Sequence, residues 1–284
     1  MSELRPLVKT VGGKSRLAAT IVSLFPRGID VYVEPFVGGG AVFIEAREQF
    51  ATRAQVFLAD ANPTTIELLE ACRDQPTQLV HDLESASREY EADPQATFLR
   101  VRREWNEGVR SPARFVLLKQ SGFNGLWREN AAGHHNVAWG KHLTPRFPDH
   151  DDVMAWSEAL RGVHLSAARA HETLSELLRQ PDSFFQKQNV VVYLDPPYLG
   201  TFTGYTHLGW TVGDQLRLAR ACRALHKRHA SVLMSTSVYG SSLVAFCWPE
   251  ATRVPLTTRY VVSRQASDRT TLTSEVLFSG AHEW

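Results

Sequence analysis

Cysteine is scarce in this chain of 284 residues, and its spacing excludes whole classes of site. The three cysteines, Cys72, Cys222 and Cys247, lie far apart in the sequence and form no CxxC pair. Neither a disulfide framework nor a cysteine-based zinc site is therefore expected. Four histidines cluster between residues 134 and 150, but without cysteines or a regular spacing they do not predict a metal site.

Long apolar runs are missing as well. The longest, Val190–Leu194, falls far short of the roughly 18–20 residues that cross a bilayer. The first 14 residues lack the apolar region of a signal peptide. The sequence therefore predicts no membrane partner and a cytoplasmic protein.

The chain has almost no net charge, but its charges are unevenly distributed. The formal total is +1, whereas residues 97–150 hold nine basic and four acidic side chains, a local charge of +5. Trp105, Trp127 and Trp139 lie in the same stretch. Basic residues interleaved with aromatics suit nucleic acid, because phosphates take the charges and bases take the rings. The alternative is a solvated helix face above core aromatics.

Strand-like and helix-like segments alternate along most of the chain. The predicted strands are 31–33, 55–59, 163–167, 189–194 and 231–235, followed by two antiparallel strands at 252–262 and 273–279. The helices between them are predicted at 41–50, 63–73, 171–179 and 213–229, with Asn62 as an N-cap and Pro63 at the first helical position. Residues 76–150 interrupt the alternation with helices at 76–91, 94–107 and 111–121. The pattern predicts an α/β fold with a doubly wound parallel sheet and a helical insert.

A glycine cluster at 38–40 follows the first strand and precedes a helix, and Asp60 ends the second strand. Glycine allows a sharp turn and close approach to a ligand, and a carboxylate at Asp60 can accept hydrogen bonds from ribose hydroxyls. The order of strand, glycine turn, helix, strand and Asp60 predicts a site for an adenosine-containing cofactor. A purely structural turn is the alternative. The glycine cluster is not the dinucleotide fingerprint, whose third glycine would fall at Phe43. The Gly12–Gly13–Lys14–Ser15 segment is not a P-loop, because Val8 stands where its first glycine is needed.

The most specific motif is Asp195-Pro196-Pro197-Tyr198, which ends an apolar strand where such sheets bind ligands. The Asp195 carboxylate and the Pro196 carbonyl can both accept hydrogen bonds from one exocyclic amine. Tyr198 offers a flat face for stacking a planar base. Holding the amine with its lone pair toward an incoming methyl group would lower the barrier by positioning.

With these motifs assembled, the chain resembles the Dam-type DNA adenine N6-methyltransferases. The similar motifs occur in the family's order: K-x-x-G-G-K at 9–14, E-P-F-x-G-x-G at 34–40, Asp60-Ala61-Asn62, F-N-G-L-x-R at 123–128 and on to Val137, DPPY at 195–198, and a terminal strand at 274–278. The resemblance implies a Rossmann-like methyltransferase sheet that ends in an antiparallel hairpin. It further implies that residues 1–63 and 158–284 form the catalytic domain. Residues 64–157 would form an inserted target-recognition domain of helices plus a β-hairpin.

The same resemblance implies S-adenosylmethionine as cofactor and duplex DNA, with a flipped adenine, as substrate. The residues expected to contact the cofactor are Thr10, Lys14, Glu34, Phe36, Gly38, Gly40, Asp60 and Asp195. The family usually has Trp at position 10, so an aromatic contact is lost here or supplied elsewhere. Asp195, Pro196 and Tyr198 are the catalytic candidates, and Asn124, Arg128 and Lys141 are the candidates for DNA contact.

Two alternatives to this function remain open on the sequence. The same pair of acceptors would serve an RNA base or the N4 amine of cytosine. A catalytically idle DNA-binding module on the same fold is the other alternative. The protein is expected to act as a monomer, associated with the nucleoid through DNA, and the family's common GATC target does not transfer because neighbouring residues differ.

Overall fold

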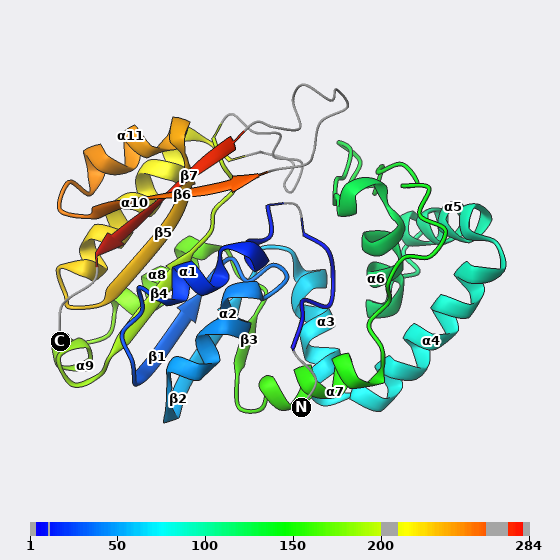
Figure 1. Ribbon diagram of the computed structural model, residues 1–284, viewed down its shortest axis with the longest axis horizontal. Coiled ribbons are helices and arrows are strands. Elements are labelled where there is room, and N and C mark those ends of the chain that lie inside the picture. The colour runs from blue at the N-terminus through cyan, green and yellow to red at the C-terminus, as the bar shows by residue number, and fades with distance from the viewer. Residues whose placement is uncertain (1–3, 11, 200–209, 260–271, 281–284) are drawn as a thin grey trace.

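A computed structural model describes residues 4–10, 12–199, 210–259 and 272–280 of the chain and contains one seven-stranded sheet (Figure 1). The strands are β1 (Ile29–Glu34), β2 (Phe50–Ala59), β3 (His164–Ser166), β4 (Val190–Leu194), β5 (Ser231–Ser237), β6 (Thr252–Arg259) and β7 (Leu272–Gly280). Their order across the sheet is β3-β2-β1-β4-β5-β7-β6. The first five run parallel, and β7 lies antiparallel between β5 and β6. The predicted doubly wound sheet with a final antiparallel pair is confirmed.

Helices cover both faces of this sheet. They are α1 (Ala18–Val22), α2 (Ala41–Ala46), α3 (Pro63–Asp74), α8 (Ala170–Leu178), α9 (Asp182–Lys187), α10 (Val212–His226) and α11 (Val238–Cys247). Alternation along β4 separates the two layers: Val191 and Tyr193 pack in the cluster with α1 and α2, whereas Val190, Val192 and Leu194 pack with α8 and α10. A strand buried on both faces explains why β4 is apolar throughout.

The insert between β2 and β3 begins with α3 and continues with α4 (Pro76–Ala92), α5 (Pro94–Asn106), α6 (Pro112–Ser121) and α7 (His150–Ala159). A capping side chain followed by proline starts α3, α5 and α6, because Asn62, Asp93 and Ser111 each accept a hydrogen bond from the backbone of the first turn. The predicted N-cap role of Asn62 is thus confirmed. The insert shares one apolar cluster with the sheet, in which Trp105 of α5 and Tyr32 of β1 are both buried.

The β-hairpin expected in the insert is not a continuous one. Residues 122–149, all described, contain only two isolated antiparallel bridges, Gly122 with Trp139 and Glu129 with His135. Further backbone hydrogen bonds, such as that from the Phe123 amide to the Ala138 carbonyl (2.9 Å), join the two sides. The glycines and polar residues of this stretch give it too little apolar alternation to sustain a ladder.

Several elements depart from the sequence-based boundaries. The second strand begins at Phe50 rather than at 55, because the preceding helix ends at Ala46 and a single 3₁₀ turn (Arg47–Gln49) follows. The helices α1, α7, α9 and α11 were not predicted; α11 contains glycine, two serines and β-branched residues, which are weak helix formers. The turn expected between the last two strands falls outside the described residues. None of the described helices is both long and apolar enough to cross a membrane.

We predict that Gly40→Ala destabilises the fold by about 2–5 kcal/mol. Gly40 caps α2 with φ of +72°, and a Cβ there would lie 2.5 Å from the ring of Trp156, which is fully buried in α7. The left-handed backbone costs about 1–2 kcal/mol for a non-glycine residue, and overpacking adds about 1–3 kcal/mol. Gly162→Ala is the matched control, because Gly162 has φ of +75° with nothing within 4 Å of the added carbon. Urea unfolding that gave equal losses for both variants would contradict the clash with Trp156.

Candidate active site

Four segments meet at the carboxyl ends of β1, β2 and β4. Because these strands are parallel and adjacent, the glycine turn after β1, Asp60 after β2 and Asp195 after β4 lie at the same edge of the sheet (Figure 1). The amino-terminal segment joins them: a Cβ on Gly39 would lie 3.1 Å from the Thr10 hydroxyl oxygen. The structure therefore brings together the motifs that were predicted to form a cofactor site.

Asp60 holds the glycine turn in shape. One carboxylate oxygen accepts a hydrogen bond from the Gly38 amide (2.9 Å) and the other from the Asn62 amide (2.8 Å). Gly38 and Gly40 both have positive φ, which explains the glycines at these positions. Burial raises the pKa of Asp60, while the two amides and the charge of Lys119 act in the opposite direction. Burial is the largest of these effects, and the two amide hydrogen bonds limit the rise in the pKa of this carboxyl group.

Lys14 forms the centre of a buried charge cluster. Its side chain is 4% exposed, and its Nζ lies 2.7 Å from Asp195 Oδ2 and 3.6 Å from Glu275 Oε2. It also donates a hydrogen bond to the Gly12 carbonyl (3.0 Å). Burial raises the pKa of Asp195, and the adjacent ammonium of Lys14 counteracts that effect. The cluster joins the amino-terminal segment, the Asp-Pro-Pro-Tyr turn and β7.

Tyr198 is engaged through both its ring and its hydroxyl. The hydroxyl donates to Glu275 Oε2 (2.9 Å) and lies 3.3 Å from Asp195 Oδ1. The Lys14 ammonium sits 5.1 Å from the ring centroid, within cation–π range. Burial and the two nearby carboxylates raise the pKa of Tyr198 well above its ordinary value, so the hydroxyl stays a donor. The sequence suggested only the flat ring face.

Glu34 and Phe36, two of the predicted cofactor residues, contact other side chains of the protein. Glu34 is 2% exposed and accepts a hydrogen bond from the Tyr32 hydroxyl (2.8 Å) inside the apolar layer. Burial raises its pKa to about 8, more than the hydrogen bond lowers it. Phe36 is half-buried and packs edge-to-face on Trp210, which precedes α10, at 5.9 Å. A direct cofactor contact by either residue stays a prediction.

Glu275 and Lys119 are two charged residues of the site that sequence reasoning missed. Glu275 is 1% exposed in β7, and Lys119 is 3% exposed in α6. Burial lowers the pKa of Lys119 to about 8, and the negative charge of Asp60 acts against this shift. The available signals were an acidic residue inside an apolar terminal strand and a lysine directly after the apolar run 115–118. Among the described residues, no cluster of His, Cys, Asp and Glu could hold a metal ion.

The three candidates for DNA contact follow α6, where the chain forms a turn at residues 123–128, here called the Asn124 turn. Asn124 is exposed with φ of 53°, and Lys141 is exposed with φ of 58°. The Gly140 amide donates to the Ser121 carbonyl (2.8 Å), which places Lys141 beside the end of α6. Arg128 is held by Asn136, whose side-chain oxygen lies 2.5 Å from the Arg128 Nε. A Cβ on Gly125 would lie 2.8 Å from the Cβ of Lys9, so the turn packs on the amino-terminal segment.

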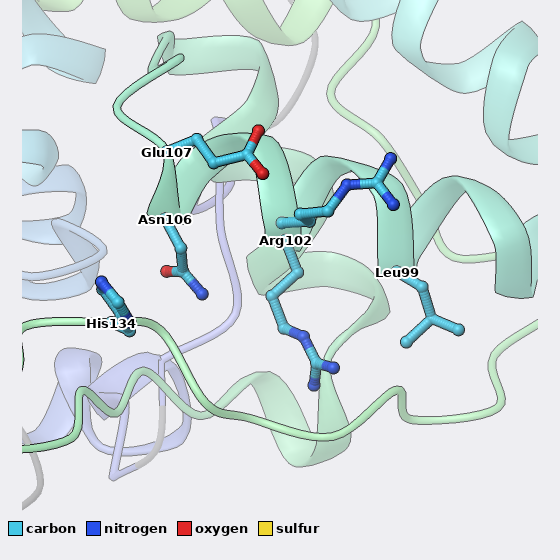
Figure 2. Close-up of a pocket in the computed structure, with 6 residues that line it drawn as sticks. Leu99, Arg102, Asn106, Glu107 and His134 are labelled. Atoms are coloured by element: carbon cyan, nitrogen blue, oxygen red, sulfur yellow. The ribbon is translucent and has the colours of Figure 1, made fainter.

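Several basic side chains of residues 97–150 form ion pairs or hydrogen bonds within the insert. Arg100 and Arg114 both pair with Glu104, and Arg146 pairs with Asp152. Arg102, in the pocket between α5 and the loop that carries His134 (Figure 2), donates to the Val137 carbonyl (2.9 Å). The local charge of +5 is therefore partly committed to internal contacts.

Two tryptophans of residues 97–150 are not available to stack on bases, the role suggested for them by the sequence. Trp105 is 1% exposed and Trp127 is 5% exposed, and both belong to the core. Their rings pack edge-to-face on each other at 5.3 Å. Trp139 is half-buried, and Phe123, in the same stretch, is 43% exposed. The alternative of core aromatics beneath a charged face therefore holds for these two tryptophans.

Comparison with known proteins supports the same assignment. Residues 11–265 match the family model of the D12 class N6 adenine-specific DNA methyltransferases. A DNA adenine methylase of Vibrio cholerae is 32% identical over 83% of this chain and 82% of its own. The type II methyltransferase M1.LlaDCHI of Lactococcus lactis subsp. cremoris is 31% identical, and M.MjaIII of Methanocaldococcus jannaschii is 29% identical, each over more than four-fifths of both chains. These findings favour adenine in DNA over an RNA base or cytosine N4, and an enzyme over an idle binding module.

We predict that Glu34 makes the stability of the protein fall as the pH rises. The unfolded chain loses the Glu34 proton near pH 4.5, whereas the folded chain keeps it to about pH 8. Within this window the folded state binds more protons, so the free energy of unfolding decreases with pH, by about 2 kcal/mol between pH 6 and pH 8. Glu34→Gln mimics the protonated form and should lack this component. Urea unfolding at both pH values checks it; equal pH dependence in the two proteins would contradict a neutral Glu34.

Proposed function

Since the chain belongs to the D12 class of N6 adenine-specific DNA methyltransferases, we propose that it takes its methyl group from S-adenosylmethionine and transfers it at the Lys14–Asp195–Tyr198 cluster. The observation that carries this proposal is the 2.7 Å ion pair between Lys14 and Asp195. It joins the segment beside the glycine turn to the Asp-Pro-Pro-Tyr turn, so cofactor and target amine would meet at one place.

The chemistry of the donor set fits S-adenosylmethionine. Asp60 at the end of β2 suits the ribose hydroxyls, and a turn built of glycines would let a ligand approach the backbone closely. Lys14 and Asp195 complement the carboxylate and ammonium of an amino-acid group. Thr10 contacts the glycine turn where the family usually has Trp, so the contact there is smaller and non-aromatic. When bound, S-adenosylmethionine supplies a methyl group on a positively charged sulfur.

The residues of the Asp-Pro-Pro-Tyr turn would orient the target amine. The Asp195 carboxylate and the Pro196 carbonyl would each accept a hydrogen bond from the N6 amine. This arrangement would direct the nitrogen lone pair toward the methyl group. Tyr198 stacks on the base, and its hydroxyl bonds to Asp195 and Glu275 fix the ring. The Lys14 ammonium counteracts the effect of burial on the pKa of Asp195, which favours the carboxylate form that accepts hydrogen bonds.

The DNA is proposed to be duplex, with the target adenine rotated out of the helix, at a cost of a few kcal/mol. Residues 64–157 would form the target-recognition domain, and Asn124, Arg128 and Lys141 would contact the duplex. Asn and Arg side chains can read adenine and guanine edges in the major groove. The enzyme is proposed to act as a monomer. Such an enzyme would act on the DNA of the nucleoid in the cytoplasm.

We predict that Asp60→Ala weakens S-adenosylmethionine binding about 10- to 100-fold, because hydrogen bonds to a charged group contribute about 1.5–3 kcal/mol. Affinity for DNA alone should change less than threefold. Titration calorimetry with the cofactor and fluorescence anisotropy with a duplex separate the two effects. Asp182→Ala is the control, since Asp182 is 77% exposed in α9 and pairs with Arg228 at a distance from the glycine turn. Absence of any cofactor heat in the wild-type enzyme would refute the proposed cofactor.

A pair of substitutions at Tyr198 separates its ring from its hydroxyl. Tyr198→Phe keeps the stacking face but removes the hydrogen bonds to Asp195 and Glu275, so methyl transfer should slow about tenfold. Tyr198→Ala removes the ring too and should cost at least about tenfold more, since stacking of a base contributes about 1–3 kcal/mol. Transfer of labelled methyl to duplex DNA measures both. Equal losses would assign the whole effect to the hydroxyl and contradict stacking.

A further inference from the structure

The segment that carries Arg128 is not held by a continuous β-ladder. Residues 122–149, all described, contain only two isolated antiparallel bridges. A two-stranded hairpin is marginally stable at best in water even when its ladder is complete. Contacts from outside this stretch are therefore needed to give it one fixed conformation.

Helix α5 supplies such contacts, chiefly through one asparagine. The Asn106 side-chain oxygen accepts a hydrogen bond from the His135 amide (2.8 Å), and its side-chain nitrogen donates to the His135 carbonyl (3.1 Å). One carboxamide thus makes the pair of hydrogen bonds that an adjacent antiparallel strand would make. Arg102, one turn earlier on the same face of α5, donates to the Val137 carbonyl (2.9 Å). Figure 2 shows both side chains reaching from α5 toward this loop.

The other side of His135 is held by an aromatic contact. Its ring is buried, at 1% exposure, and lies 4.4 Å from the ring of Trp127. Trp127 directly precedes Arg128 in the chain. His135 is therefore fixed through its backbone by α5 and through its ring by the segment that carries Arg128.

The next residue, Asn136, holds the Arg128 guanidinium. The Arg128 Nε donates to the Asn136 side-chain oxygen (2.5 Å), and its Nη2 donates to the Asn136 carbonyl (3.2 Å). The Asn136 amide donates in turn to the Arg128 carbonyl (3.0 Å). Asn136 lies between His135 and Val137, the two residues that α5 binds. Because a guanidinium is planar and its donors point in fixed directions, its orientation follows that of these acceptors.

We propose that Asn106 is a positioning residue for DNA recognition, which fixes residues 135–137 and thereby the direction of the Arg128 guanidinium. This inference rests on the proposed function, namely that Arg128 contacts the duplex. Asn106 acts through the His135 backbone and Asn136. A duplex then meets an arginine that is already oriented, and less binding free energy is lost to ordering its long side chain.

The test measures methyl transfer to a duplex that carries the site found by methylation-sensitive sequencing of DNA from cells that produce the enzyme, and to duplexes with one base pair changed. Arg128→Ala should lower kcat/KM on the cognate site about tenfold or more and relax the choice at one base pair. Asn106→Leu has nearly the same volume but makes neither hydrogen bond to His135. It should lower kcat/KM about three- to tenfold and relax the choice at that same base pair.

The Asn106→Leu loss should lie in KM for the duplex, with kcat and the affinity for S-adenosylmethionine changed less than about twofold, since the chemical step is untouched. The retained cofactor affinity also reports that the variant is folded. Asn106→Asp, which keeps the acceptor for the His135 amide, should lose less than Asn106→Leu. Combining Asn106→Leu with Arg128→Ala should add less than about twofold to the loss of Arg128→Ala alone, because both changes remove the same contact.

Thr97→Val is the matched control. Thr97 lies in the same helix, is 6% exposed, and its hydroxyl donates to a backbone carbonyl, that of Glu89 (3.0 Å), away from residues 135–137. This variant should keep the wild-type choice of base pair even if its melting temperature falls as much as that of Asn106→Leu.

Three results would overturn the inference alone: an unchanged choice of base pair in Asn106→Leu beside an altered one in Arg128→Ala, additive losses in the double variant, or an equal relaxation in Thr97→Val. Wild-type kinetics in Arg128→Ala would overturn the proposed role of Arg128 in DNA contact and the inference with it. A wild-type protein that transfers no methyl group to the duplex would overturn the proposed function itself.

Discussion

The site depends on one buried cation between two carboxylates. Asp195 and Glu275 approach each other at the end of the sheet; burial and the charge of Glu275 raise the pKa of Asp195, and the Lys14 ammonium counteracts both effects. Tyr198 completes the cluster, since its hydroxyl lies within hydrogen-bond distance of both carboxylates. Removing the cation would leave buried charge uncompensated, which costs far more than an exposed ion pair contributes.

This cluster explains how distant parts of the chain form one site. Lys14 precedes the first strand, Asp195 follows β4, and Glu275 lies in β7, which inserts antiparallel between β5 and β6. The terminal strand thus contributes a side chain to the site as well as an edge to the sheet. The two apolar layers hold the strands in register beneath it, so the carboxyl ends of β1, β2 and β4 stay at a common level.

The insert packs on the sheet more closely than an independent target-recognition domain would. Its tryptophans belong to the same apolar cluster as β1, and several of its arginines are bound to internal acids and carbonyls. Charge counting over a segment overestimates what a partner would meet, because it does not distinguish an arginine that closes a loop from one that faces solvent. The turn at Asn124 packs on the amino-terminal segment at Lys9, and the next residue, Thr10, contacts the glycine turn.

The sequence by itself determined the alternation of strands and helices, the glycine turn, Asp60 and the Asp-Pro-Pro-Tyr motif. These are local signals: strand periodicity, glycine where φ is positive, a cap followed by proline, and a short motif at a strand end. Only the tertiary structure decided that Glu275 and Lys119 belong to the site, because their importance comes from burial beside charges far away in the chain. It also decided that Trp105 and Trp127 are core and that Glu34 turns inward to Tyr32, since a sequence does not show which face of a helix or strand is covered.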